Sequence, residues 1–283
     1  MDEPSVRSGR ARALILLFAV LGAQAGVARA QTPTKEDAAA LLNRFRASIW
    51  EVPTYAEFDL REMPRRGDEH VFHGRFWGAR NDRGPVTRFE LDGARGAFSR
   101  RILLQGGPDG GLWISDGPGA GVPSPGAVLK PIVPGVEITP FDLLPMPYLY
   151  WLDADFIGAE RVRGRQAYVY MLEAPADFSA ANPGIRAVRV YLDGQYEALE
   201  QSEVIGSGGP VTKTLSLLEL RKVGPRWIPK DVDVRTEGTR DKTRLSLTAV
   251  AVGVTPDPAT FDPSLLGTPV APPGGDQLLP VAQ

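Results

Sequence analysis

The sequence predicts a mainly β fold, with one N-terminal helix and an antiparallel sheet of about twelve strands. Two observations lead to this. Short runs in which apolar and polar residues alternate recur along most of the chain, and turn signals rich in Gly, Pro, Asn and Asp separate them. The chain also holds 31 glycines and 26 prolines, which favours many turns and short strands.

The helix is expected near the start of the predicted domain. Thr34 followed by Asp37 resembles a capping box with aspartate in place of glutamate. Pro53 closes the stretch. The apolar residues between them recur with a helical period and share one face: Ala38, Leu41, Leu42 and Phe45. We therefore expect an amphipathic helix that covers a core.

From Tyr55 onward the apolar period changes to two, which is typical of half-buried strands. Turn signals at residues 81–85 and 92–93 separate the first runs. This half of the chain therefore predicts an antiparallel meander. Its apolar runs include Phe58 and Leu60, Phe72 to Phe76, Phe89 and Leu91, Arg101–Gln105 and Leu112–Ser115.

The second half has the same character. In its last strand, Leu245 and Leu247 share one face while Lys242 and Arg244 share the other. We therefore expect one face of the sheet to be apolar and the other to be polar and solvent-exposed. The expected strands are Phe156–Arg161, Ala167–Glu173, Arg186–Leu192, Ala198–Ile205, Val211–Val223, Trp227–Arg235 and Lys242–Val252.

Between the halves lies a segment that fits neither a central strand nor a long helix. Residues 117–147 contain eight prolines and five glycines. They run into an apolar and aromatic cluster at residues 141–151, in which we expect a short helical turn. Such a segment predicts either a plug under one end of a barrel or a lid over a cavity.

Residues 1–30 read as an export signal. Arginines come first, the apolar run Ala13–Leu21 follows, and the small-x-small site ends at Ala30. The apolar run has nine residues, whereas a spanning helix needs roughly 20. We expect cleavage after Ala30 and release into the periplasm. The chain has no cysteine, which excludes lipidation at the new N-terminus and disulfide or thiol chemistry.

The remaining composition narrows the function further. Without residues 1–30 the net charge is about −4, which argues against a nucleic-acid partner. His70 and His73 point to opposite faces of a strand, so they predict no shared metal site. Asp153 and Asp155 are the carboxylate pair that a hydrolase would use, but acids near a turn are usually solvated. We therefore predict no enzyme, no metal and no cofactor.

What remains is an apolar sheet face. Eight strands already enclose room for side chains or one small ligand, and this chain supplies more. Pockets of that kind are lined mainly by apolar side chains. The sequence therefore permits either a closed core or a hydrophobic cavity.

Several segments resemble the outer-membrane lipoprotein-sorting proteins, the LolA-like family. The resemblance covers roughly residues 38–262 and departs from the family's carriers in the long Pro/Gly segment and the proline-rich tail. It is carried by diffuse strand and turn motifs at Glu137–Trp151, Gly158–Arg165, Arg189–Asp193 and Arg226–Val234.

The resemblance implies a half-open antiparallel barrel of about 11–12 strands with an N-terminal helix and a short helical, Pro-rich cap. It implies a periplasmic carrier for acyl chains, with lipoproteins as cargo and membrane proteins as partners. The missing cysteine favours a free carrier over a lipid-anchored receptor. The alternative is an envelope sensor or interaction module of the same fold with a filled cavity.

These expectations define domains and sites. We expect a signal peptide at 1–30, a lipid- or lipoprotein-binding domain at 31–267 and a disordered Pro-rich tail at 268–283. The predicted cavity lining is Phe58, Leu60, Phe72, Phe76, Phe89, Leu91, Leu245 and Leu247, with Leu144, Met146, Tyr148 and Trp151 as the cap.

Overall fold

The computed structural model describes residues 33–92, 99–224 and 226–281. These residues belong to one compact unit, and the expected signal peptide lies outside them. In this part of the chain, no helix combines the length and the apolar character needed to cross a membrane.

The N-terminal helix forms as its sequence predicts. α1 (Lys35–Ser48) begins with a capping box: Thr34 Oγ1 accepts a hydrogen bond from Asp37 N (3.1 Å), and Asp37 Oδ2 accepts one from Thr34 N (3.2 Å). Both bonds satisfy N–H groups that a helix start leaves without partners. The predicted apolar face is the buried one, with Ala38, Leu41, Leu42 and Phe45.

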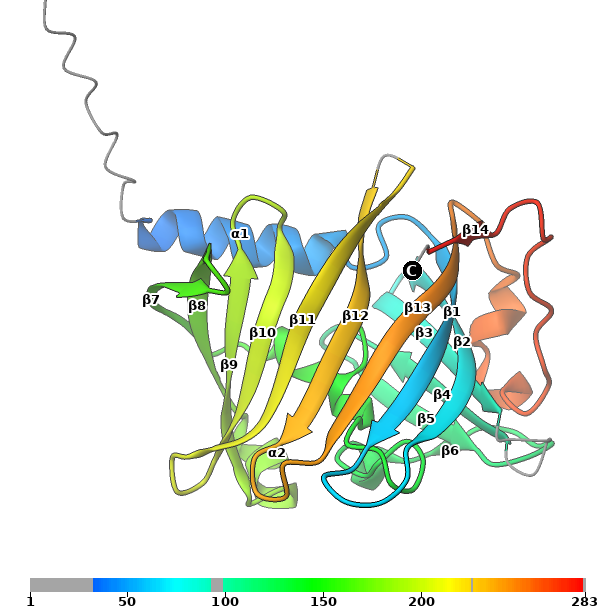
Figure 1. Cartoon of the computed structure of the whole chain (residues 1–283), viewed down its shortest axis with the longest axis horizontal. Helices are drawn as coiled ribbons and strands as arrows, with labels where there is room; N and C mark the ends of the chain where they lie inside the picture. Colours follow the sequence, from blue (N-terminus) through cyan, green and yellow to red (C-terminus); the bar gives the residue numbers. More distant parts are fainter. Residues whose placement is uncertain (1–32, 93–98, 225, 282–283) are drawn as a thin grey trace, which may run out of the picture. The chain divides into compact units, whose positions relative to one another are not determined.

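Among the described residues, fourteen strands form one antiparallel sheet that does not close (Figure 1). Its order is β6-β5-β4-β3-β2-β1-β13-β12-β11-β10-β9-β8-β7, and β14 pairs with β13. A short helix, α2 (Ala176–Ala181), lies between β8 and β9. The strands are β1 (Thr54–Met63), β2 (His70–Asn81), β3 (Gly84–Asp92), β4 (Ser99–Gln105), β5 (Gly111–Ser115), β6 (Val122–Pro123), β7 (Ala154–Val162), β8 (Arg165–Glu173), β9 (Ile185–Asp193), β10 (Ala198–Gly206), β11 (Val211–Val223), β12 (Arg226–Thr236), β13 (Lys242–Val252) and β14 (Leu279–Pro280).

The sheet curves around one large apolar core, so alternate residues of each strand point inward. Two glycines of β2 make room for large rings on this inner face. A Cβ on Gly74 would lie 2.4 Å from the Phe58 ring, and a Cβ on Gly78 would lie 2.4 Å from the Trp50 ring. The alternation read from the sequence therefore assigns the inner face correctly.

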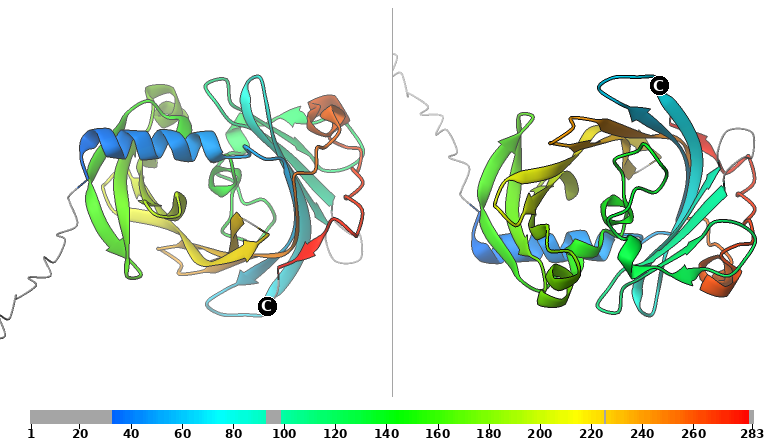
Figure 2. Two further views of the ribbon diagram at one scale, coloured as in Figure 1. Left: turned by 90° about the horizontal axis from the view of Figure 1, so that it is seen from above. Right: turned by 90° about the horizontal axis from the view of Figure 1, so that it is seen from below.

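The Pro/Gly segment lies inside the curve of the sheet (Figure 2). Its short 3-10 helices are η2 (Pro125–Ala127), η3 (Pro140–Asp142) and η4 (Pro147–Tyr150). Ile132, Val133, Phe141 and Leu149 are almost fully buried in the core. This burial is the arrangement that the plug interpretation predicts.

Polar contacts tie this inserted segment to the second half of the sheet. Asp142 Oδ2 pairs with Lys213 Nζ of β11 at 2.9 Å. Tyr148 Oη lies 3.1 Å from Ser202 Oγ of β10, and Thr243 of β13 accepts a hydrogen bond from the segment's Glu137 N at 2.7 Å. Because these groups are buried or half-buried, leaving them unpaired would cost about 1–3 kcal/mol each.

α1 runs from β7 and β8 toward the start of β1 (Figure 2). Tyr170 of β8 donates to the Ala38 carbonyl at 2.8 Å, and Arg80 of β2 donates to the Ile49 carbonyl at 2.8 Å. Arg46 reaches the Trp151 carbonyl at the end of the inserted segment (3.2 Å). The helix is therefore tied to both sides of the open sheet and to the segment within it.

The C-terminal segment, residues 256–281, covers the outer face of the first strands. We call this segment the strap. It includes η5 (Pro258–Phe261), η6 (Pro263–Leu265) and β14. Phe261 packs in two small outer clusters, one around Tyr55 and Trp77 and one around Leu103. The predicted Pro-rich tail begins within this segment, and between residues 268 and 281 Val270 and Leu278 pack beside Tyr55 and Trp77 while β14 pairs with β13.

The sheet splits between β12 and β13. These strands pair only over Asp231–Arg235 and Lys242–Ser246, although each has 11 residues. Pro229 lacks a backbone N–H, which suits a strand that leaves its neighbour at this point. β14 pairs with β13 beyond the split, and Val281 (5% exposed) joins the inner core there.

Candidate functional site

The structure brings the twelve predicted cavity residues into one cluster on the inner face. Nine of them are buried and three are partly buried against the same cluster, so every one lies on the predicted side of the sheet. The buried nine are Phe58, Leu60, Phe76, Phe89, Leu91, Met146, Tyr148, Trp151 and Leu247, and the other three are Phe72, Leu144 and Leu245. Whether they line a ligand cavity stays a prediction.

The aromatic members are in direct contact with one another. The Phe76 and Phe89 ring centroids lie 5.4 Å apart, which is a normal packing distance. Tyr148 donates its hydroxyl toward Met146 Sδ at 3.0 Å, and burial raises its pKa above the ordinary range. The neighbouring Tyr150 is partly buried, and this desolvation raises its pKa to about 12. Neither phenol ionises near neutral pH.

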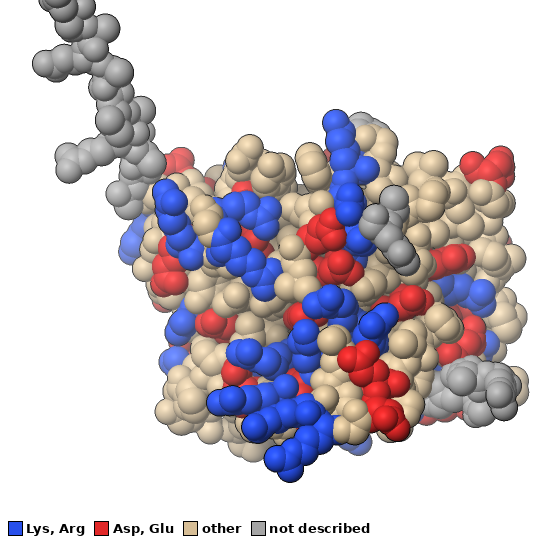
Figure 3. All heavy atoms as spheres, viewed as in Figure 1, with Lys and Arg blue, Asp and Glu red and all other residues tan. Residues whose placement is uncertain are grey.

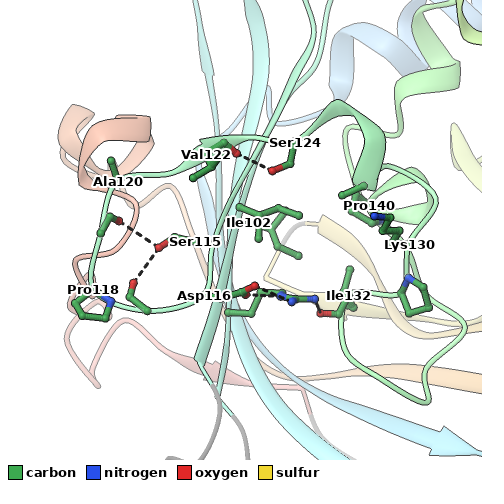
Figure 4. A pocket seen from close by; sticks show the side chains of 16 residues that line it. Ile102, Ser115, Asp116, Pro118, Ala120, Val122, Ser124, Lys130, Ile132 and Pro140 are labelled. Atoms are coloured by element: carbon green, nitrogen blue, oxygen red, sulfur yellow. Dashed lines mark hydrogen bonds and ion pairs between the residues drawn. The ribbon is translucent and has the colours of Figure 1, made fainter. Parts of the chain in front are cut away.

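A pocket of about 560 Å³ opens beside this core, at the β5 and β6 edge of the sheet (Figure 4). We call it the edge pocket. Its volume falls within the roughly 300–1,000 Å³ of small-molecule sites. β4 and β5 form one wall and the inserted segment forms the other. The lining residues are Arg100, Ile102, Ile114, Ser115, Asp116, Gly117, Pro118, Gly119, Ala120, Val122, Ser124, Ala127, Lys130, Pro131, Ile132 and Pro140.

The floor of the edge pocket belongs to the large core. Ile102 and Ile132 are buried members of that cluster, and Ile114 packs against it. The pocket floor therefore belongs to the same packed cluster as the twelve predicted residues. The pocket itself is lined by other residues.

The rim of the edge pocket is polar. Arg100 makes a two-fold ion pair with Asp116, with Nε to Oδ1 at 2.6 Å and Nη2 to Oδ2 at 2.8 Å. Its Nη1 donates to the Ile132 carbonyl at 2.8 Å, which joins β4 to the inserted segment. Lys130 is exposed on the opposite wall, and Figure 4 shows it beside Pro140. An apolar floor under charged groups suits an amphiphilic ligand.

The loop at the outer end of the pocket is held in place by the strap. Ser115 Oγ bonds the Gly117 carbonyl at 2.9 Å, and Gly121 N donates to the Pro263 carbonyl at 2.6 Å. Gly119 and Gly267 meet backbone to backbone, so closely that a Cβ on Gly267 would lie 2.0 Å from the Gly119 carbonyl oxygen. The pocket wall thus depends on the C-terminal segment.

A second hollow, of about 590 Å³, lies on the outer face of β10–β13. It is polar, and its acids and bases alternate: Asp233 pairs with Arg244 at 2.7 Å and with Lys242 at 3.1 Å. Figure 3 shows the mixed charge of this face. Because its charges are paired with one another, we assign it no ligand.

The residues considered for chemistry lie apart from the edge pocket. His70 and His73 are exposed and each contacts a carboxylate of β1, Glu62 at 3.1 Å and Asp59 at 2.7 Å. Asp153 and Asp155 are exposed near the start of β7. In the described part of the chain, His, Asp and Glu side chains do not gather in groups of three or more that could hold a metal ion.

Sequence reasoning missed the edge pocket. Ile102 and Ile114 fell in predicted strands, but strand periodicity cannot tell which inward residues face a gap and which face a packed neighbour. Ile132 lies in the Pro/Gly segment, where no periodicity exists. The one available signal was the density of proline and glycine after β5, which marked an irregular wall.

Comparison with solved structures identifies the architecture. A domain named as an outer-membrane lipoprotein-sorting protein from Vibrio parahaemolyticus matches with TM-score 0.67 and 14% identity, covering 82% of this chain and 97% of that one. A DUF1329 family protein from Desulfovibrio piger matches with TM-score 0.67 and 13% identity, covering 82% and 98%. A LolA superfamily protein from Nitrosomonas europaea matches with TM-score 0.62 and 11% identity, covering 79% and 96%.

The sequence itself matches no family model and no curated protein. Identities of 11–14% establish a common fold and nothing finer. The match covers 79–82% of this chain in each case. The chain therefore has the half-open barrel of the lipoprotein-sorting proteins, the LolA-like fold.

Proposed function

We propose that this protein is a periplasmic carrier that binds acyl chains, with outer-membrane lipoproteins as its cargo. The observation that supports this most directly is the position of the edge pocket, whose apolar lining packs directly on the inner core. Ile102, Ile114 and Ile132 form the pocket floor, and the twelve predicted residues extend the apolar surface beyond it.

Partition of an acyl chain out of water would supply the binding free energy. Each CH₂ group buried contributes about 0.8 kcal/mol, so a chain gains affinity along its whole length without specific contacts. We propose that the chain enters at the edge pocket and that the inserted segment shifts to admit more of it. Delivery would then need a membrane-bound partner that competes for the chain.

A second candidate function is a non-enzymatic sensor or interaction module with a filled cavity. The observation that favours it is the packing of the inserted segment, in which Phe141 and Leu149 are 1% and 0% exposed. In this proposal the segment stays in place, and partners recognise the outer surface instead. The two candidates differ in whether an apolar ligand binds at all.

The test is binding of a fluorescent long-chain fatty acid, together with native mass spectrometry of protein purified from the periplasm. A carrier should bind the probe and retain lipid. Ile114→Arg should abolish uptake and leave the circular dichroism spectrum unchanged, because Ile114 is only half-buried and lines the open pocket.

Val71→Arg provides the matched control. Val71 is also a β-branched strand residue, but it is 40% exposed on β2 and lies outside the edge pocket. This variant should take up the probe like the wild type. Absence of both bound lipid and probe binding would refute the carrier and leave the filled module.

A further inference from the structure

The outer half of the β11–β12 hairpin has no strand paired to either of its edges, while its Val223 and Ile228 pack on the inner core. β10 pairs with β11 only as far as Ser216, so residues 217–223 have no paired strand on that side, although the Leu217 carbonyl accepts a hydrogen bond from Arg163. β12 pairs with β13 only from Asp231, so residues 226–230 have none on theirs. Figure 1 shows the tip of this hairpin, in yellow, rising beyond the neighbouring strands.

This part of the hairpin carries an exposed aromatic side chain and two free cations near its tip. Trp227 is 52% exposed and sits opposite Lys222 in the pairing register, and Arg226 sits opposite Val223. Within the described residues, neither Lys222 nor Arg226 has an acidic partner, and both are exposed. Figure 3 shows Lys and Arg side chains gathered at this end of the hairpin.

The neighbouring β9–β10 turn adds a second aromatic ring. Tyr196 is 37% exposed, and its ring centroid lies 5.7 Å from that of Trp227, edge to face. Asp193 Oδ1 fixes the turn by accepting hydrogen bonds from Gln195 N and Tyr196 N. Arg165 lies 6.0 Å from the Tyr196 ring. The exposed pair is therefore held in place rather than free to fold back.

We propose that this tip docks on an anionic lipid surface. Trp227 and Tyr196 would enter the headgroup layer, where amphipathic rings are favoured. Lys222 and Arg226 would pair with lipid phosphates, and each cation near an anionic leaflet contributes to attraction.

The chemistry of the tip favours a bilayer over a protein partner. A protein interface would need a broad patch, whereas this one is a narrow two-stranded tip. Two unpaired cations around half-exposed aromatic rings match a headgroup layer, which offers phosphate at the surface and apolar chains beneath it. The proposal does not depend on the acyl-chain function, because docking and uptake are measured separately.

The test is co-sedimentation of the purified full chain with two kinds of vesicle: phosphatidylcholine alone, and phosphatidylcholine with phosphatidylglycerol. The wild type should bind the anionic vesicles and bind the neutral ones weakly. Lys222→Gln with Arg226→Gln should lower the apparent affinity about 30-fold, which corresponds to about 1 kcal/mol for each surface cation. Trp227→Ser should also weaken binding, and Trp227→Tyr should restore it.

Matched controls come from the opposite end of the strands. Arg65→Gln with Arg66→Gln removes the same charge from the exposed β1–β2 loop. Leu152→Ser removes the most exposed large apolar side chain, at 95% exposure, before β7. Both should bind like the wild type, and all variants should still take up a soluble fatty-acid probe if the wild type does.

Two results would overturn the proposal. One is equal binding of the wild type to neutral and anionic vesicles, or no binding to either. The other is equal loss in the control variants and the tip variants, which would show that charge or apolar area anywhere on the surface accounts for binding.

Discussion

At the scale of single residues, the most constrained site is a buried ion-pair network under the strap. Arg88 is fully buried, and its guanidinium lies 2.7 Å from Glu90 Oε1. It also donates to three strap carbonyls, those of Thr260, Leu266 and Thr268. Burial lowers the pKa of Arg88, and Glu90 opposes that effect. The strap carbonyls therefore satisfy the buried guanidinium of Arg88, and Arg88 in turn holds the strap in place.

Arg88→Met should lower the free energy of unfolding by about 3–5 kcal/mol, because it removes a positive charge that compensates the buried carboxylate of Glu90. Denaturant unfolding gives the magnitude. Limited proteolysis should also show faster cleavage within residues 256–281, since their carbonyls lose a common donor. Arg61→Gln breaks an exposed 3.6 Å pair with Glu69 and should cost no more than about 1 kcal/mol.

Two acids on the outer face should respond to pH in opposite directions. Burial tends to raise the pKa of Asp233, but hydrogen bonds from Arg244 and Lys242 leave it below its ordinary 3.8. The stability that Asp233 contributes is therefore present above about pH 4 and is lost as pH falls through its folded pKa. The penalty of Asp233→Asn should be largest at neutral pH and shrink below pH 4 in urea unfolding series.

Glu200 provides the opposite case. Burial raises its pKa above the ordinary 4.5, although Arg165 at 2.6 Å opposes the shift. Its contribution is therefore full below about pH 4.5 and is lost as pH rises through the folded pKa. The stability of Glu200→Gln relative to wild type should improve as pH rises. Parallel slopes for the two variants would contradict the opposite pKa directions.

At the scale of elements, the sheet is interrupted where β12 leaves β13. The last strand, β14, pairs with Ala249 and Val250 of β13, and Val281 N donates to the Thr248 carbonyl at 2.9 Å. Because Val281 belongs to the inner core while Leu279 is 46% exposed, the end of the chain closes the split with one side chain. The strap thus joins the outer face to the core.

Val281→Ser should lower stability by about 1.5–3 kcal/mol, the value of burying one such side chain. Leu279→Ser, two residues away, should change it by no more than about 0.5 kcal/mol, since Leu279 is half-exposed. Thermal unfolding of both variants gives the comparison. Equal effects would show that Val281 does not fill a core site.

At the scale of the whole molecule, local sequence patterns predicted the helix and the strands, but not where the irregular segments lie against them. The capping box at Thr34 and the alternation in β13 are signals within one element, and the start of α1 and both ends of β11 and β13 match the sequence prediction. The position of the strap could not be predicted from the sequence, because its proline-rich sequence has no regular spacing of apolar residues. It is held by Arg88, which lies some 170 residues earlier in the chain.

The same limit applies to the candidate site. All twelve predicted residues lie in the inner cluster, and for the eight on strands the inward direction follows from a period of two. The edge pocket could not be read from the sequence, because an opening depends on where an irregular segment fails to fill space. The pairing of Arg100 with Asp116 and Ile132 joins three separate segments and has no local signature.

The whole molecule should become more stable when its core receives an acyl chain. A ligand that binds only the folded state at 100 times its Kd adds about 2.7 kcal/mol. For a domain of this size that is a rise in Tm of about 5–10 °C. A long-chain fatty acid should produce this shift, and a short-chain acid at equal concentration should not, because burial scales with chain length. Ile114→Arg should abolish the shift while Val71→Arg keeps it. No shift with any chain length would mean that the inserted segment fills the core permanently, as the sensor or interaction module requires.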